Sequence, residues 1–394
     1  MRISEDSWLT IFPDALFLFN MKTVVAETVM LGAEVFKTIG DVTVIPDREI
    51  GPAQIAAADV LIIRSPTRVT RELIANSSLK FIGTATAGFE HIDTAAVEEC
   101  GIQWSAAPGC NADSVADYIT AALFKLNIEL AGKTIGIIGV GEVGSRVAKR
   151  AAALGLNILL NDPPRAEKET SGDFTPLETL LAEADIVTLH TPLTAGGKWP
   201  TLHLADEKFF AEIKSGAVFI NAARGKIVDD AALLNASRAG KISKTVLDVW
   251  DPEPQIPAEL LHIAAIGTPH IAGHSFEGKL NGTMQMYQAV CGHFNIPATW
   301  NPAPVLPPVD VPELTIDSRG KTDLEVIAEA VAGIYDITRD CLTAETVSQF
   351  DILRKNYPVR RELKNTVVHL SEHRPELTAR LIGAGFGSEA PHRR

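Results

Sequence analysis

A glycine-rich turn between a strand-like run and a helix-like run limits what this chain can fold into. A β-branched run that starts at Thr134 leads directly into Gly139, Gly141 and Gly144, and a helical pattern opens at Val143. In such a turn the first glycine allows a tight bend, the second lets the backbone approach a pyrophosphate, and the third lets helix and strand pack closely. The start of the helix adds unpaired N–H groups and the positive end of its dipole. The pattern predicts a dinucleotide site formed by Gly139, Gly141, Glu142, Val143 and Gly144.

The residue after the next predicted strand helps to decide between a bound dinucleotide and a turn without a ligand. The strand Asn157–Asn161 is followed by Asp162. A carboxylate at this position accepts hydrogen bonds from the ribose hydroxyls of NAD and repels the 2′-phosphate of NADP. We therefore expect NAD as the cofactor, with Asp162 as its ribose ligand. A glycine-rich turn with no ligand is the alternative.

The composition excludes some partners. The chain has 394 residues, which is typical of two or three domains. It is 46% hydrophobic and 22% charged, as is common in soluble globular proteins. Its net charge of −13 argues against a nucleic acid or an anionic membrane as the main partner. An anionic small-molecule substrate would need locally placed arginines or lysines.

The cysteines and the N-terminus indicate where such a chain works. The four cysteines stand alone, with neither a C-x-x-C pair nor the spacing of metal ligands, so we expect no metal and a reducing, cytoplasmic compartment. No apolar run reaches the roughly 18 residues that span a bilayer. Pro13 and Asp14 interrupt the apolar start, which makes a poor signal peptide. We predict that residues 1–20 are an extension outside the fold, which begins after Met21.

Two long stretches alternate short apolar runs with helical patterns, which predicts parallel sheets covered on both faces. We expect an α/β fold with two doubly wound parallel-sheet domains: a substrate-binding domain (21–112 and 276–300) and an NAD-binding Rossmann domain (113–275). The predicted strands are Thr23–Ala26, Val42–Ile45, Val60–Ile63, Lys80–Gly83 and Gln103–Ser105 in the first, and 134–138, 157–161, 186–190, 217–221, 244–248 and 264–267 in the second.

A proline-rich stretch precedes a smaller C-terminal unit. Residues 301–312 carry five prolines and should form an extended linker. Residues 313–394 are predicted to hold a small sheet and three helices, in an α+β arrangement, with one helix at Val347–Asn356. A unit of this size is marginally stable alone, so packing against a second copy is a natural remedy. We therefore predict a dimerisation domain and a homodimer.

Ionisable side chains follow several predicted strands, at the edge where open α/β sheets bind ligands. Oxidation of a 2-hydroxy acid needs a base for the hydroxyl proton, a carboxylate to orient that base, and a guanidinium to clamp the substrate carboxylate. His270, Glu253 and Arg224 supply these groups in turn, and Asp248 could bind the nicotinamide carboxamide or ribose. Taken singly, each has a structural alternative, such as a turn contact or a solvated surface charge.

The combined segments resemble a known family. Ile137–Gly144, Asn161-Asp162, Ile220–Gly225, Leu247–Pro254 and Thr268–Gly273 are similar to the D-isomer-specific 2-hydroxyacid dehydrogenases. Further segments resemble one branch of that family, namely Phe81–Gly88, Ser105–Asn111, Asn161–Arg165, Leu202–Lys208 and Leu353–Tyr357. This resemblance implies that NAD oxidises 4-phospho-D-erythronate to (R)-3-hydroxy-2-oxo-4-phosphobutanoate, on a route to pyridoxal 5′-phosphate. It also implies a C-terminal dimerisation domain.

The resemblance implies roles for individual residues as well. The catalytic residues would be Arg224, Glu253 and His270. The NAD contacts would include Asp162, Thr191, Ala222, Ala223, Asp248 and Gly273. The substrate contacts would be Ser65, Thr86 and His274, with Arg64 as a further candidate because it follows a strand. His274 stands where the branch usually has tyrosine, and Ala26-Glu27-Thr28 departs from the usual end of the first strand.

Two rival functions stay open at this point. A D-3-phosphoglycerate dehydrogenase, or another D-2-hydroxyacid dehydrogenase, would use the same three residues, and its C-terminal unit could be regulatory. A non-catalytic NAD-binding protein similar to the dehydrogenase-derived corepressors is the rival from another class, and the acidic charge and the complete catalytic set argue against it. The group that holds the substrate phosphate is also open; the candidates are Arg64, His274, and Arg354 or Arg360 from a partner's C-terminal unit.

Overall fold

The computed structural model describes residues 21–169 and 172–388, so the predicted extension of residues 1–20 lies outside the described part. The chain divides into two compact units. The first contains the residues up to Cys110 together with Lys279–Leu306, and the second contains Asn111–Gly278 and the residues from Pro307 onwards. Each unit is built on its own parallel sheet, which confirms the predicted α/β class.

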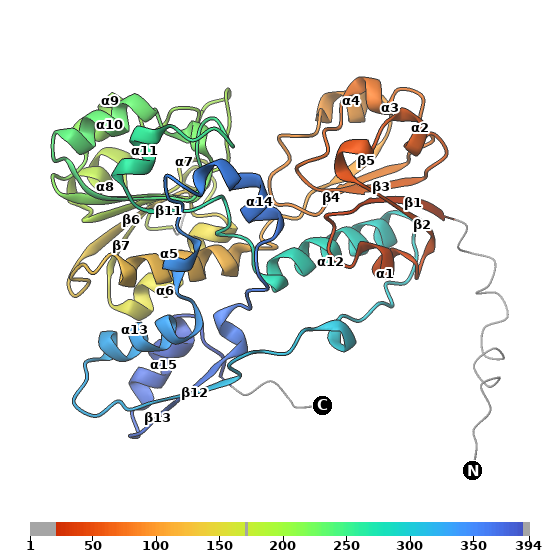
Figure 1. The fold of residues 1–394 in the computed structure, drawn as a ribbon. Coiled ribbons are helices and arrows are strands. Elements are labelled where there is room, and N and C mark those ends of the chain that lie inside the picture. The colour runs from red at the N-terminus through yellow and green to blue at the C-terminus, as the bar shows by residue number, and fades with distance from the viewer. Residues whose placement is uncertain (1–20, 170–171, 389–394) are drawn as a thin grey trace, which may run out of the picture. The chain divides into compact units, whose positions relative to one another are not determined.

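The first unit has a five-stranded sheet in the order β2-β1-β3-β4-β5 (Figure 1). Its strands are β1 (Met21–Ala26), β2 (Gly40–Ile45), β3 (Val60–Ile63), β4 (Phe81–Thr84) and β5 (Gln103–Ser105). Its helices are α1 (Gly32–Phe36), α2 (Pro52–Ile55), α3 (Arg71–Ile74) and α4 (Thr94–Glu99), and most of α12 (Phe276–His293). β3 and β4 are buried along their whole length, as expected for strands covered on both faces. Helix α12 contributes Met286, Tyr287 and Val290 to this core.

The second unit has a six-stranded parallel sheet in the order β11-β10-β9-β8-β6-β7. The strands are β6 (Thr134–Ile138), β7 (Asn157–Asn161), β8 (Ile186–Leu189), β9 (Ala217–Asn221), β10 (Ile242–Leu247) and β11 (Ala264–Gly267). The order reverses at β6, which lies between β7 and β8. Ligands bind at the carboxyl ends of strands at such a switch point, and the glycine turn directly follows β6.

Helices cover both faces of this sheet, and β9 shows why the sequence allows it. Val218 and Ile220 join the core beneath α5 and α6, whereas Ala217 and Phe219 join the core on the opposite face. Side chains alternate between the faces of a strand, so a continuous apolar run serves two layers. The helices are α5 (Ala112–Lys125), α6 (Glu142–Leu154), α7 (Pro163–Ala166), α8 (Leu177–Glu183), α9 (Glu207–Glu212), α10 (Asp230–Arg238) and α11 (Ala258–Ile263).

The C-terminal residues pack on the second unit. The strands β12 (Glu313–Ile316) and β13 (Val367–Leu370) form a parallel pair, covered by α13 (Asp323–Ile334) and α15 (Pro375–Gly383). Side chains of α13 and α15 share one core with α5 and α6, including Val326, Ile327, Leu377 and Leu381. The burial that so small a unit needs is thus supplied within one chain. The predicted homodimer stays a prediction.

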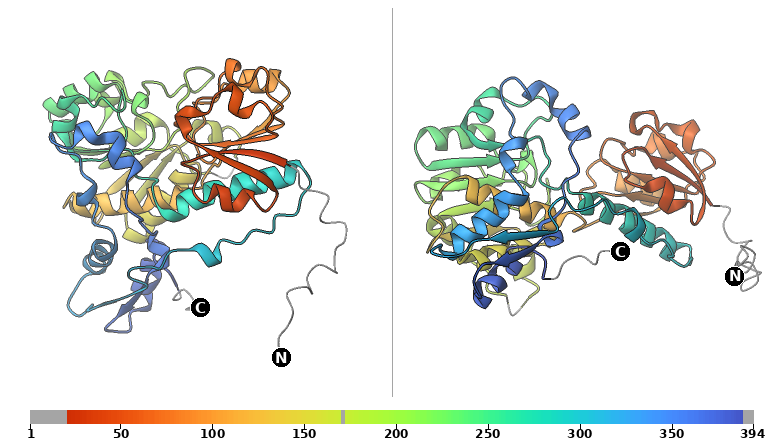
Figure 2. Two further views of the ribbon diagram at one scale, coloured as in Figure 1. Left: turned by 45° about the vertical axis from the view of Figure 1, so that its right-hand side comes forward. Right: turned by 60° about the horizontal axis from the view of Figure 1, so that its bottom comes forward.

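The segment between α13 and β13 leaves this layer. The helix predicted at Val347–Asn356 is a 3-10 turn, η7 (Val347–Gln349), followed by the short helix α14 (Phe350–Lys355). Phe350 is buried in the core formed with α8–α11, and the Leu342 N–H donates to the carbonyl of Gly267 at the end of β11 (2.7 Å). Figures 1 and 2 show α14 beside the green part of the second unit, apart from β12 and β13.

Within the described residues, no helix combines the length and the hydrophobicity that crossing a membrane requires. The same part of the chain contains no group of three or more His, Cys, Asp or Glu side chains placed to hold a metal ion.

Candidate active site

The glycine turn after β6 is shaped by close backbone contacts. Gly139 has a φ of +86°, and a Cβ there would lie 2.7 Å from the carbonyl carbon of His190. A Cβ on Gly144 would lie 2.0 Å from the carbonyl oxygen of Gly139. A Cβ on Gly141 would meet no atom within 4 Å. Two of the glycines are thus required by the fold, and the third leaves the open space that a pyrophosphate needs.

Asp162 lies directly beside this turn. One of its carboxylate oxygens accepts a hydrogen bond from the Val140 N–H (2.8 Å), and the other accepts from the Arg165 N–H (3.1 Å) and caps α7. The Arg165 guanidinium also donates to the carbonyl of Val140. The carboxylate is therefore fixed at the glycine turn, and each oxygen keeps a lone pair with which it could accept from a ribose hydroxyl.

Three other predicted cofactor positions also border this space. The Thr191 hydroxyl is buried without a hydrogen-bond partner in the described part of the chain, and its backbone lies against Gly139. A buried hydroxyl normally finds a partner, so this atom fits a site that a bound group completes. Glu142 and Val143 form the first turn of α6, where the free N–H groups of the helix lie. These residues fit NAD.

The turn after β9 carries Ala222, Ala223 and Arg224. Asn221, which is buried, accepts from the Ala223 N–H (3.0 Å) and donates to the carbonyl of Arg224 (2.9 Å). A Cβ on the next residue, Gly225, would lie 2.0 Å from the carbonyl oxygen of Trp250. The turn that bears Arg224 therefore packs directly against the turn that leads to Glu253.

Glu253 and His270 form a pair, as the sequence predicts. The Nδ1 of His270 lies 2.8 Å and 3.1 Å from the two Glu253 carboxylate oxygens, and one of these oxygens also accepts from the Trp250 N–H (3.1 Å). Burial opposes the ionisation of Glu253, but His270, the Arg354 charge and the Trp250 N–H together lower the pKa of this carboxyl. The ionised carboxylate thus binds Nδ1 and leaves Nε2 of the imidazole to face a substrate.

The loop that presents His270 is held by Asp248. One oxygen of this buried carboxylate accepts from the Thr268 hydroxyl (2.6 Å) and the Ile271 N–H (2.8 Å), and the other accepts from the Ala272 N–H (3.0 Å). Burial raises its pKa. His270 itself has a φ of +56°, a strained conformation for a residue with a side chain, which these hydrogen bonds help to maintain. The predicted contact of Asp248 with NAD stays a prediction.

Residues distant in the sequence support the same loop, and sequence reasoning missed three of them. The Tyr118 hydroxyl lies 2.8 Å from that of Thr268, and the Trp250 indole N–H donates to the Thr268 carbonyl (2.9 Å). The Ser114 hydroxyl donates to the carbonyl of Ala272 (2.8 Å). Tyr118 and Ser114 lie on α5, and no short motif marks them.

Arg360 joins this support from the C-terminal segment. Its Nη2 donates to the Ala272 carbonyl (2.7 Å) and to Ser114, and its guanidinium lies 4.3 Å from the centre of the Tyr335 ring. Burial works against its charge, but Tyr335, Tyr357 and nearby carboxylates raise its pKa above the ordinary value. The sequence suggested Arg360 as a phosphate ligand from a partner; the structure places it under the His270 loop of its own chain.

The predicted substrate contacts divide between the units. Arg64 and Ser65 follow β3, and Thr86 follows β4, all in the first unit. The Thr86 hydroxyl lies 2.7 Å from that of Thr84 and donates to the carbonyl of Gly88 (2.8 Å).

His274, by contrast, belongs to the second unit, where its ring lies edge-on to Tyr357 with 5.8 Å between the centroids. The adjacent Gly273, a predicted NAD contact, packs so tightly that a Cβ there would lie 2.1 Å from the Asn111 side chain. The roles of these residues towards substrate and NAD stay predictions.

The sheet, the glycine turn and the Glu253–His270 pair are typical of a dehydrogenase that uses NAD. Residues 115–272 match the family model described as D-isomer specific 2-hydroxyacid dehydrogenase, NAD binding domain. Residues 305–383, which include α14 and Arg360, match a domain of unknown function.

Relatives extend this match to nearly the whole chain. It is 44% identical over 360 residues to an erythronate-4-phosphate dehydrogenase of Cronobacter sakazakii, covering 89% of this chain and 95% of the relative. An erythronate-4-phosphate dehydrogenase of Photorhabdus laumondii is 42% identical over 377 residues, covering 94% of this chain and 100% of the relative. The NAD⁺-bound 3-phosphoglycerate dehydrogenase structure of Entamoeba histolytica matches with a TM-score of 0.60 and 26% identity, covering 70% and 95%. The chain belongs to the D-isomer specific 2-hydroxyacid dehydrogenases, in the group of the erythronate-4-phosphate dehydrogenases. It is an NAD-dependent oxidoreductase, and the expected cofactor is confirmed.

Proposed function

We propose that this enzyme oxidises 4-phospho-D-erythronate to (R)-3-hydroxy-2-oxo-4-phosphobutanoate with NAD, a step in the synthesis of pyridoxal 5′-phosphate. The observation that carries the proposal is the Glu253–His270 pair, 2.8 Å apart, in a chain that is 44% identical to a relative named erythronate-4-phosphate dehydrogenase. Location in the cytoplasm and assembly as a homodimer through the C-terminal segment belong to the same proposal.

The roles of the three catalytic residues follow from their chemistry. Nε2 of His270 takes the proton of the C2 hydroxyl as the C2–O bond becomes a carbonyl. Glu253, bound to Nδ1, fixes the ring orientation and stabilises the imidazolium that forms. Arg224 clamps the C1 carboxylate through two parallel N–H···O bonds and so orients C2. NAD, when bound, accepts the hydride that leaves C2.

Steady-state assays with 4-phospho-D-erythronate and D-3-phosphoglycerate, side by side, test the substrate. We expect kcat/KM to favour the four-carbon acid. A preference for 3-phosphoglycerate would refute the proposed substrate, but it would not change the reaction class.

The clamp is tested separately with Arg224→Lys. A lysine keeps the charge but cannot form the two parallel bonds, so kcat/KM should fall by roughly 100-fold or more. Near-normal kinetics would refute the assigned role. NAD binding, measured through the quenching of tryptophan fluorescence, serves as the control for folding.

A further inference from the structure

The proposed substrate carries two anionic groups, and its phosphate needs a cation of its own. The chain has a net charge of −13, so the overall field of the protein does not attract such a substrate. Arg224 is assigned to the carboxylate at the other end of the molecule. The inference below rests on that proposed function and concerns the cation that completes the site.

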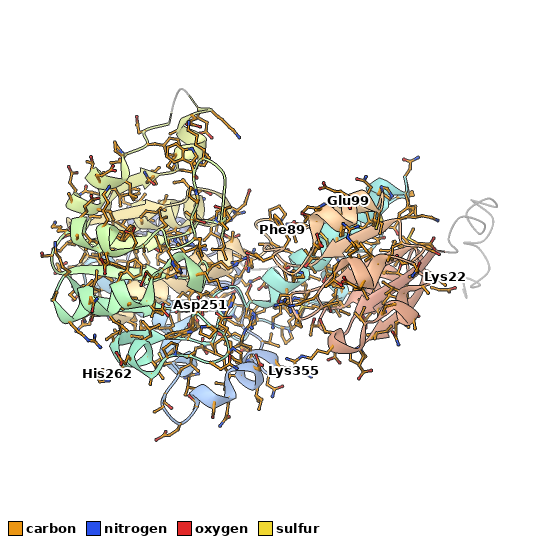
Figure 3. The ribbon with its side chains drawn as sticks, turned by 90° about the horizontal axis from the view of Figure 1, so that it is seen from above. Lys22, Phe89, Glu99, Asp251, His262 and Lys355 are labelled. Atoms are coloured by element: carbon orange, nitrogen blue, oxygen red, sulfur yellow. The ribbon has the colours of Figure 1, made fainter. Side chains whose placement is uncertain are left out.

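Helix α14 of the C-terminal segment lies beside the turn that follows Glu253, and Tyr357, just after α14, contacts the loop that follows His270. Its first turn and the preceding η7 line a pocket together with Pro254–Ile256, which directly follow Glu253. Just beyond its other end, the Tyr357 ring packs against His274, four residues after His270. Figure 3 labels Asp251, two residues before Glu253, and Lys355, the last residue of α14. The helix therefore lies beside the Glu253 turn at one end and the His270 loop at the other.

Arg354 of α14 carries a guanidinium that has no hydrogen-bond or ion-pair partner among the described residues. Its Nε is buried, and the side chain forms no hydrogen bond or ion pair with any described residue. The guanidinium lies 5.6 Å from the centre of the Phe350 ring, and Phe350 is itself fixed in the core. Its charge is close enough to Glu253 to help lower the pKa of that carboxyl. A held guanidinium with free donors is a preorganised anion site.

The neighbouring Arg360 differs from Arg354 because its Nη2 already forms hydrogen bonds within the chain. Its Nη2 already donates to Ala272 and Ser114, and its guanidinium is stacked on Tyr335. Arg360 thus supports the His270 loop through Nη2, although its Nε and Nη1, like Nε of Arg354, are buried without a hydrogen-bond partner among the described residues. What distinguishes Arg354 is that none of its nitrogens is bound to that loop.

We propose that Arg354 is a specificity-determining residue that binds the terminal phosphate of the substrate. The C-terminal segment, whose family model has no assigned function, thereby supplies the group that selects a phosphorylated 2-hydroxy acid. The clamp at Arg224 and the guanidinium of Arg354 hold opposite ends of the substrate, with C2 presented to His270.

The test compares 4-phospho-D-erythronate with D-erythronate, which is the same acid without the phosphate. In Arg354→Met, kcat/KM for the phosphorylated acid should fall roughly 10- to 100-fold, mainly through KM, as expected when a charged hydrogen-bonded group is lost. For D-erythronate, kcat/KM should fall much less, so that the ratio of the two kcat/KM values changes by about 10-fold or more. Arg354→Lys, which keeps a charge but not the fork, should fall in between.

Arg339→Met is the matched control, because the Arg339 side chain is 84% exposed and its only described ion pair is with Asp336 on the surface. An equal loss with both acids would overturn the proposal and show that Arg354 acts through Glu253 instead. Unchanged kinetics with both acids would also overturn it and place the phosphate elsewhere. If Arg354→Met does not fold, Arg354→Lys decides by the same comparison.

Failure of the proposed function looks different. In that case the wild-type enzyme prefers 3-phosphoglycerate, and the comparison is run with 3-phosphoglycerate and D-glycerate. A selective loss on 3-phosphoglycerate in Arg354→Met then supports the phosphate role even though the substrate is another one.

Discussion

The two halves of the site in the second unit lie on one sheet edge but are built differently. The glycine turn is defined by the backbone: Gly139 and Gly144 leave no space for a side chain, and Asp162 ties the turn to the next strand. The His270 loop is defined by side chains that come from α5, from Asp248 directly after β10 and from the C-terminal segment.

This difference separates local from distant control. The cofactor half runs from Gly139 to Thr191, a single stretch of the chain, so it should respond to changes in the turn alone. The catalytic half depends on contacts between residues more than two hundred positions apart, such as Arg360 and Ser114. Removing the Arg360 contacts should therefore affect catalysis and leave NAD affinity unchanged.

The largest expected effect comes from the catalytic base. His270→Asn removes the proton acceptor, so kcat should fall by roughly 10²- to 10⁴-fold, as is typical of lost general-base catalysis. NAD affinity should stay the same because the glycine turn is not touched. Steady-state kinetics and a fluorescence titration measure the two quantities. His262→Asn, an exposed histidine on α11, is the control, and a parallel loss of NAD affinity in His270→Asn would break the division into halves.

The next effect separates two glycines of one turn. A methyl group at Gly144 would lie 2.0 Å from a carbonyl oxygen, so Gly144→Ala should destabilise the fold by about 1–3 kcal/mol. Gly141→Ala meets no protein atom, so it should leave stability unchanged and weaken NAD binding. Urea unfolding and NAD titration of both variants check this. Equal stability losses would show that Gly141 serves the fold rather than the cofactor.

Much of the cofactor half could be predicted from the sequence because its determinants are local. The strand at 134–138, the three glycines and Asp162 follow one another along the chain, and periodicity and spacing reveal them. The Glu253–His270 pairing was also predicted, since both residues follow neighbouring parallel strands and must meet at one edge.

The support of the catalytic loop could not be predicted in this way. Ser114 and Tyr118 look like ordinary positions on an apolar helix, and only the packing of α5 under β11 brings them to Thr268 and Ala272. Arg360, like Arg354, was only a candidate phosphate ligand from a partner, because a C-terminal unit of this size is marginally stable alone. Its core is shared with α5 and α6, a contact that no periodic pattern within either segment reveals.

A smaller effect on kcat is expected when the support of the His270 loop by Arg360 is removed. Arg360→Met removes the donor to Ala272 and Ser114, which should loosen the His270 loop and lower kcat by about 10-fold, a loss of roughly 1.4 kcal/mol in the barrier. The KM for NAD should not change. Arg319→Met, which alters an exposed pair with Asp317, is the control. An equal loss of kcat in both variants would remove the special role of Arg360.

The smallest expected effect is a pH dependence of stability at the junction between α5 and the C-terminal segment, where Asp117 contacts Leu363. Asp117 on α5 is buried, accepts from the Leu363 N–H (3.0 Å) and lies 2.6 Å from Arg150. Burial raises its pKa to about 6; Glu362 adds to this rise, and Arg150 opposes it. The folded protein therefore keeps a proton that the unfolded chain has released, and stability should decrease as pH rises from about 4 to about 6.

The slope from this one group should be at most about 1.4 kcal/mol per pH unit. Asp117→Asn cannot titrate, so urea unfolding at several pH values between 4 and 7 should show a flatter profile for the variant than for the wild type. Identical profiles would mean that another group governs this window. A flatter profile accompanied by unchanged NAD affinity would confirm that the junction with the C-terminal segment is energetically separate from the glycine turn.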